Sequence, residues 1–122
     1  MTDIDRLVTT ADEQRREDFD WGTLVWADSG ELTGTDALTV GRVTIEAGER
    51  NPEHRHPNCD EALYVLAGTL RHTVGDEERR LTAGDLIHVP RGERHRAVND
   101  GAEDAVAVIA YDTGEREFEP VE

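Results

Sequence analysis

Three histidines and one glutamate have the residue types and spacing of a metal site. His54 and His56 are two residues apart, so in an extended segment their side chains lie on the same face. Glu61 follows five residues after His56, and His95 comes 34 residues after Glu61, so both would reach the pair from other strands. Three imidazole nitrogens and one carboxylate oxygen form a donor set that suits a divalent first-row metal: Fe, Mn, Ni, Co, Cu or Zn.

Glycines and a proline surround these residues at regular intervals. One run reads Gly, five residues, His, one residue, His, four residues, Glu, six residues, Gly, from Gly48 to Gly68. A second run reads Gly, five residues, Pro, one residue, Gly, two residues, His, three residues, Asn, from Gly84 to Asn99. The two runs resemble the two signature motifs of the cupin superfamily, with every fixed position matched and 15 residues between them.

The resemblance covers residues 48–99 and implies a small jelly-roll β-barrel of roughly six to eight strands with a metal held inside. Carried over position by position, it implies one divalent transition metal per chain, with four ligands: His54, His56, Glu61 and His95. Asn99 would close the strand that follows the last ligand. Asp60 is also a carboxylate close to His56, but only Glu61 keeps the six-residue spacing to the next motif glycine.

The rest of the chain must supply strands that bring these residues together. From Trp21 onward, short apolar segments are separated by glycine, proline, asparagine and aspartate, which is typical of an all-β sandwich or barrel. We therefore predict an all-β, antiparallel fold with strands at 22–27, 38–46, 62–66, 69–74, 79–81, 86–89, 95–98 and 106–111. Residues 75–78 and 99–101 predict two hairpin turns, because they include residue types that tolerate positive φ.

Two unequal parts are expected, an N-terminal arm over residues 1–20 and a cupin-like barrel over residues 21–122. The arm is polar, so it would form a short helix or stay extended. In the barrel, alternation from Glu61 places Leu63 and Val65 on the same inward face, where they give the metal an apolar lining. The acidic run 115–119 is interpreted as a solvated edge.

Two further residues are candidates for catalysis. His72 lies in the predicted strand 69–74, either looking into the barrel as an acid or base or as a partly buried strand histidine, which is the interpretation we favour. Arg50 lies near the ligand strand and could clamp an anionic substrate, although ion pairing is the default for an arginine on so acidic a surface. A structural role is favoured for His88 and also for Cys59, as a small buried hydrophobic residue.

The composition excludes several classes of function. The 122 residues carry 28 acids and 13 bases, a formal charge of −15, and every base is arginine. Such a charge repels phosphates, so we expect neither nucleic acid nor a membrane surface as partner. Without lysine the chain has no Schiff-base nucleophile and no phosphate-binding lysine of the Walker type. Because about 1 M salt shortens the screening length to about 3 Å, we interpret the acidity as adaptation to a salt-rich cytoplasm, with an arginine-biased genome as the alternative.

Location and assembly are expectations from the same sequence. The first residues lack the basic and apolar regions of a leader, and the longest apolar runs have about seven residues against the roughly 20 that span a bilayer. The single cysteine forms no intrachain disulfide. We therefore expect a cytoplasmic protein. Because an open sheet edge favours pairing with another chain, we also expect a homodimer.

The function expected from this site depends on its open coordination positions. Four protein ligands on a six-coordinate metal leave about two positions, for a bidentate hydroxy acid, keto acid or catechol, or for one substrate atom and dioxygen. We expect a mononuclear metal-dependent enzyme of the oxygenase, isomerase, decarboxylase or lyase type that acts on a small oxygen-rich molecule, with dioxygenase-like chemistry slightly ahead. The alternative is a non-catalytic barrel that binds a metal or a small ligand as a sensor or binding module.

Overall fold

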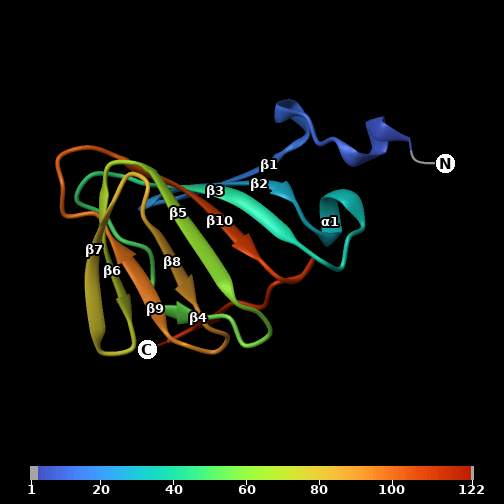
Figure 1. Ribbon diagram of the computed structural model, residues 1–122. Helices are drawn as coiled ribbons and strands as arrows, with labels where there is room; N and C mark the ends of the chain where they lie inside the picture. The colour runs from blue at the N-terminus through green and yellow to red at the C-terminus, as the bar shows by residue number, and fades with distance from the viewer. Residues whose placement is uncertain (1–2, 122) are drawn as a thin grey trace.

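The structure is a computed structural model that describes residues 3–121, and its strands form an antiparallel jelly-roll β-barrel of two sheets (Figure 1). The six-stranded sheet has the order β1-β2-β3-β10-β5-β8, and the five-stranded sheet has the order β11-β4-β9-β6-β7. Neighbouring strands in each sheet run antiparallel. The predicted fold class is therefore confirmed.

The strands are short and are joined by tight turns. They are β1 (Arg15–Phe19), β2 (Gly22–Asp28), β3 (Thr39–Ile45), β4 (His54–Arg55), β5 (Glu61–Ala67), β6 (Thr69–Val74), β7 (Glu77–Thr82), β8 (Leu86–Val89), β9 (His95–Val98), β10 (Ala105–Tyr111) and β11 (Glu119–Pro120). In the described part of the chain, helical structure is limited to two 3-10 turns, η1 (Ile4–Leu7) and η2 (Ala11–Glu13), and to α1 (Gly30–Thr33). Among residues 3–121, no helix has the length and apolar character that crossing a membrane requires.

The core lies between the inward faces of the two sheets. In β10, the buried residues Ala105, Ala107, Ile109 and Tyr111 alternate with half-buried ones. The same alternation buries every second residue of β3 and the first half of β5, including Leu63 and Val65 as predicted. Period-two patterning thus places one face of each of these three strands in the interior.

Three of the predicted strands, 69–74, 86–89 and 95–98, have the observed bounds, and the other five differ by at most two residues at an end. The predicted turn after β6 is also present, because Gly75 adopts a φ of +58° where β6 joins its antiparallel partner β7.

The predicted hairpin at residues 99–101 is wrong. β9 and β10 belong to different sheets, so residues 99–104 cross from one sheet to the other. The Asn99 side chain organises this crossing, because its amide donates to the carbonyls of Ile45 and Glu103 and its oxygen accepts from the Gly101 N–H. The residue types at positions 99–101 indicated a turn, but they do not determine which sheet the next strand joins.

Residues 1–20, predicted as a separate arm, divide into two parts. Ile4–Glu13, with η1 and η2, extend away from the barrel (Figure 1), whereas β1 pairs with β2 along its whole length at the edge of the six-stranded sheet. Residues 1–2 lie outside the described part of the chain.

Two motif glycines form turns next to the strands and segments that carry the candidate ligands. Gly68 joins β5 to β6 with a φ of +77°, and a Cβ there would lie 2.8 Å from the carbonyl oxygen of Asp104. Gly92 has a φ of +82°, and its N–H donates to the His56 carbonyl at 3.0 Å, which ties the turn before β9 to the segment after β4. Both φ values lie in the left-handed region that glycine enters without a steric penalty.

Candidate metal centre

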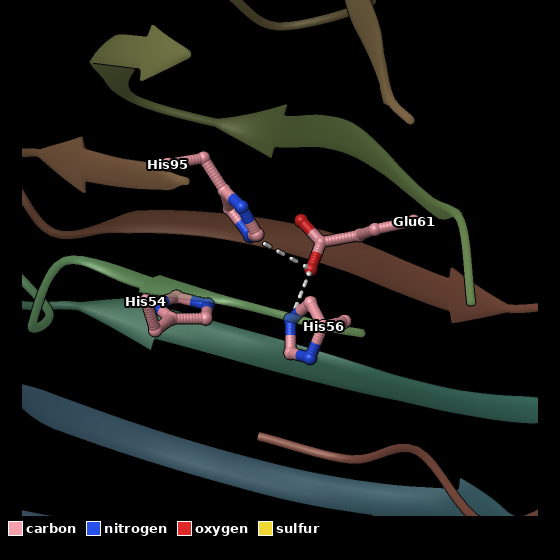
Figure 2. Close-up of side chains that lie close together, drawn as sticks. All are labelled: His54, His56, Glu61 and His95. Carbon is pink, nitrogen blue, oxygen red and sulfur yellow. Dashed lines mark ion pairs between the residues drawn. The ribbon is translucent and has the colours of Figure 1, made fainter. Parts of the chain in front are cut away.

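The four predicted ligands meet in the barrel interior. His54 begins β4, His56 follows that strand, Glu61 begins β5 and His95 begins β9. Each offers one ligand atom that lies within 4.8 Å of the other three, and all four side chains are buried (Figure 2). The structure thus brings together the residues that the motif spacing selects.

Strand register explains why these side chains converge. His54 and His95 are opposite each other in the β4–β9 pair, with ring centroids 4.3 Å apart. His56 lies two residues beyond His54 on the same side, with its ring 4.9 Å from that of His54. Glu61 enters from the other sheet, where it is opposite Tyr111 of β10 and Val89 of β8.

Backbone carbonyls fix the orientation of all three imidazoles. The Nδ1 atoms of His54, His56 and His95 lie 2.6, 2.8 and 2.9 Å from the carbonyl oxygens of Pro52, Glu117 and Glu93. Because a carbonyl oxygen can only accept, each Nδ1 carries the proton and donates it. In the neutral ring, Nε2 is then the free acceptor, which is the form that binds a metal.

With the rings neutral, the Nε2 atoms and the carboxylate form a set of acceptors that a bound cation would satisfy. Nε2 of His56 and Nε2 of His95 lie 3.3 and 3.5 Å from Oε1 of Glu61. Neither nitrogen has a hydrogen-bond partner of good geometry among residues 3–121. Buried acceptors that face one another repel unless a positive charge lies between them. The residues present therefore fit a divalent cation held by three imidazoles and one carboxylate.

The pKa shifts of the same groups lead to the same conclusion. Burial alone raises the pKa of Glu61, but the His56 and His95 imidazoles outweigh burial and hold it well below its ordinary value. Burial alone lowers the pKa of His95, but the Glu61 carboxylate raises it overall. For His54, the Pro52 carbonyl and the Glu61 carboxylate raise the pKa less than burial and the His95 imidazole lower it, so the pKa falls to about 4. The interior therefore favours one positive charge beside Glu61.

His72 lies inside the barrel rather than being partly buried as we favoured. Its side chain is 2% exposed, and its ring is stacked on that of His95 at 5.9 Å and 11°. Burial lowers the pKa of His72 to about 4, so the ring is neutral at pH 7. Its buried Nδ1 has no hydrogen-bond partner among the described residues. This is the geometry of the alternative interpretation, in which His72 looks into the interior.

A cavity of about 320 Å³ adjoins the four-residue cluster. It is lined by His54, Glu61, His72 and His95 on the metal side and by mostly apolar side chains elsewhere, among them Trp21, Leu24, Val43, Ile45, Leu63 and Ile109. Its volume is at the lower end of the range of small-molecule sites. A molecule of modest size could therefore lie against the metal position with its carbon skeleton on apolar walls.

Comparison with known protein families agrees with this geometry. The family described as "Cupin domain" matches residues 41–111, which is more than half of the chain and contains all four candidate ligands. The chain belongs to the cupin family.

Individual proteins resemble the chain over part of their length. The tetracenomycin polyketide synthase protein TcmJ of Streptomyces glaucescens is 40% identical over 68 residues, which are 56% of this chain and 46% of that protein. A structure of Bacillus subtilis oxalate decarboxylase, studied for its Mn(II) centres, matches with a TM-score of 0.80 and 27% identity over 89% of this chain and 30% of its own. An oxalate oxidase structure matches with a TM-score of 0.76 and 25% identity over 84% and 56%. The chain thus spans less than two thirds of each.

The C-terminal segment of this cupin supplies side chains that sequence reasoning missed. Phe118 stacks on His54 with ring centroids 4.6 Å apart, and Arg116 also lines the cavity. The glutamates of the acidic run 115–119 are exposed as expected, whereas of the two residues between them Arg116 is half-buried and Phe118, although 47% exposed, lines the cavity. The alternation Glu-Arg-Glu-Phe-Glu was the available signal, because a period of two separates the two sides of an extended segment.

Tyr111 was likewise passed over, although strand alternation places it on the buried face with Ile109. Its ring lies 4.9 Å from that of His56, and burial, together with the Glu61 charge, raises the pKa of its hydroxyl well above the ordinary value. Tyr111 therefore stays protonated beside the Glu61 carboxylate and is one of the groups that lower the pKa of Glu61.

The other candidates lie away from the cavity. Arg50 is exposed, where its backbone pairs with Val98, and it does not line the cavity. Asp60 is engaged elsewhere, because its carboxylate accepts from the Arg91 N–H and lies 2.8 Å from Nε2 of the exposed His88. The Asp60 carboxylate is therefore not free to act as a ligand in place of Glu61.

Cys59 is fully buried, and burial raises the pKa of its thiol to about 11.

Proposed function

We propose that this cupin is a mononuclear metal-dependent enzyme that acts on a small, oxygen-rich molecule. One observation carries the proposal: three imidazoles whose Nδ1 protons are fixed by backbone carbonyls present their free nitrogens to one buried carboxylate, and His54, His95 and Glu61 of this cluster line an apolar cavity. A site that only stabilised the fold would need no adjoining space, since structural metal sites are closed and catalytic ones keep an open position.

The candidate ligands, the apolar walls and His72 would have different roles in this enzyme. His54, His56, Glu61 and His95 would hold the cation, which when bound supplies a Lewis acid or a redox centre. The apolar walls would exclude water from the bound molecule, so that electrostatic interactions in the cavity gain strength. His72 would contact the substrate, because it lines the cavity and has a ring nitrogen without a partner among residues 3–121.

The similar proteins support the reaction class. Two of the similar solved structures are an oxalate decarboxylase, described for its Mn(II) centres, and an oxalate oxidase. Both proteins are named for a reaction of oxalate, a small dicarboxylate, so decarboxylation and oxidation of a small organic acid are the first reactions to examine. The partner we propose is therefore a small organic molecule, and Mn(II) is the first metal to supply.

The test begins with metal content. Native protein should contain close to one transition metal ion per chain, and metal-free protein should bind Mn(II), Fe(II) or Co(II) in calorimetric titration. The loaded protein is then supplied with oxalate, hydroxy acids, keto acids and catechols, while oxygen uptake and carbon dioxide release are recorded. Turnover that disappears in His56→Ala and persists in His88→Ala, an exposed histidine, supports the proposal. A bound metal without turnover on any substrate favours a binding module instead.

A further inference from the structure

A second space lies beside the metal-site cavity and shares part of its wall. This groove is more polar, has a volume of about 520 Å³ and is lined by residues of β1, α1 and the C-terminal segment. Glu17, Arg116 and Phe118 line both spaces. Apart from the histidines, Arg116 is the one basic side chain among residues 3–121 that lines the inner cavity. A cationic group therefore lies between an apolar cavity and the polar groove next to it.

Aromatic rings surround the Arg116 guanidinium. Its Cζ lies 4.6 Å from the ring centroid of Trp26, 5.3 Å from that of Tyr111 and 5.8 Å from that of Phe118. Cations at such distances are attracted to the faces of aromatic rings, and the flat guanidinium suits such stacking. These contacts hold the group in place without using any of its N–H donors.

Those donors have no acceptor in the described part of the chain. No carboxylate of residues 3–121 forms an ion pair with Arg116, and none of its N–H groups donates a hydrogen bond there, although six other arginines form ion pairs: Arg15, Arg16, Arg55, Arg71, Arg80 and Arg94. Glu17, in the same wall, is engaged elsewhere, because it accepts from the Trp26 indole at 2.7 Å and lies 3.8 Å from Arg15. In so acidic a chain, an unpaired arginine at a cavity is available for an external anion.

Two rings that contact Arg116 also contact metal ligands. Tyr111 lies 4.9 Å from the ring of His56, and Phe118 lies 4.6 Å from the ring of His54. The guanidinium is therefore one aromatic ring away from the candidate metal centre. A molecule that reaches the centre with one end would meet Arg116 with a group several atoms away.

We propose that Arg116 binds a carboxylate of the substrate, so that the substrate is an organic acid with a metal-binding oxygen group at one end, a short apolar body and a carboxylate at the other. This inference rests on the proposed function and narrows its substrate class. The fork of guanidinium donors matches the two oxygens of a carboxylate. The apolar body would lie against Trp21, Leu24 and their neighbours in the cavity wall. Arg116 thus determines specificity, while the metal ligands bind the reacting end.

Three probes that share a catechol ring test this assignment: catechol without a carboxylate, 3,4-dihydroxybenzoate with a carboxylate on the ring, and 3-(3,4-dihydroxyphenyl)propanoate with a carboxylate on a two-carbon chain. Each is titrated without oxygen into Zn(II)-loaded protein, and binding is measured by calorimetry and by tryptophan fluorescence. At least one carboxylated probe should bind about 10-fold to 100-fold more tightly than catechol, the range of a hydrogen bond to a charged group. Arg116→Gln should remove this difference and leave catechol binding unchanged.

Arg42→Gln is the matched control, because it removes the same charge from an exposed position in β3 and should keep the difference. Equal binding of catechol and both carboxylated probes, equal losses for all probes in Arg116→Gln, or the same loss in Arg42→Gln would overturn the proposal. Repeating the titrations on metal-free protein distinguishes failure of the Arg116 assignment from failure of the proposed metal-dependent function. If the protein binds no metal, the proposed enzyme is ruled out, whereas an Arg116-dependent preference for carboxylated probes would still stand.

Discussion

The two sheets of the barrel contribute different chemistry to one interior. The five-stranded sheet and the segment that follows its strand β4 present the imidazoles of His54, His95 and His56, whereas the six-stranded sheet presents one candidate ligand, the carboxylate of Glu61, among mostly apolar side chains. Neither face could hold a divalent cation well alone, because imidazoles without an anion leave its charge uncompensated and a lone buried carboxylate has no partner. The site therefore exists only when the two sheets are closed on each other.

Removing a ligand from either sheet should have the largest effect. His95→Ala deletes a donor of the five-stranded sheet, and Glu61→Gln replaces the donor of the six-stranded sheet with a neutral group of similar shape. We expect each to weaken metal binding by at least about 100-fold, since loss of groups that only support ligands already costs roughly 10-fold to 100-fold. Calorimetric titration with Mn(II) measures this, with His88→Ala as the control. Unchanged affinity in Glu61→Gln would show that the six-stranded sheet contributes no ligand.

Acid should destabilise the metal-free protein through the five-stranded sheet. His54 and His72 have pKa values of about 4 in the fold, below the ordinary 6.5, so from pH 6.5 down to about 4 the unfolded chain binds protons that the folded chain does not. The free energy of unfolding should therefore fall across this window, on the order of 3 kcal/mol for each group. His95 does not add to this loss, because the Glu61 carboxylate raises its pKa above the ordinary value, so its contribution changes at higher pH.

Urea unfolding at several pH values measures this slope. His72→Gln should reduce the slope by about half between pH 6.5 and 4, because it removes one of the two groups. A profile that is flat in the wild-type protein, or unaffected by His72→Gln, would contradict the assignment of the slope to these buried imidazoles.

The crossings between the sheets should differ in their tolerance to substitution. Gly68, between β5 and β6, combines a φ of +77° with a backbone contact at 2.8 Å, whereas Gly84, between β7 and β8, has a φ of +95° and open space around the missing Cβ. We expect Gly84→Ala to cost about 1 kcal/mol, from backbone conformation alone. Gly68→Ala adds a clash and should cost about 2 to 4 kcal/mol. Urea titration compares them, and equal costs would show that the backbone around Gly68 relaxes.

Salt should affect the exterior much more than the interior. The −15 formal charge is carried mainly by exposed carboxylates, whose repulsion falls as the screening length shortens. The melting temperature should therefore rise by a few degrees between about 0.1 M and 1 M KCl, while Mn(II) affinity at the buried cluster changes little. A melting temperature that falls or stays constant would remove the basis for interpreting the composition as adaptation to salt.

Local patterns in the sequence predicted most of the barrel and all four candidate ligands. Period-two alternation predicts strands such as β10, and fixed spacing selects Glu61 over Asp60, whose carboxylate is occupied. β1 was missed because Arg15–Phe19 has no buried face and so no alternation to detect. The course of the chain after Asn99 depends on the pairing of β10 with β3 and β5, which are distant in the sequence, and turn residues do not encode such pairing. The homodimer stays a prediction.

The last residues of the described chain bear on how the protein should be handled. The Glu117 carbonyl accepts from His56, Pro120 is opposite His54 in the β4–β11 pair, and the Val121 N–H donates to Glu53 at 3.0 Å. Residues 117–121 and the segment that carries His54 and His56 therefore stabilise each other, so loss of order in one should disturb the other. An affinity tag or a proteolytic cut at this end would loosen two ligands without altering either, and a loaded metal should in turn protect the tail from proteases.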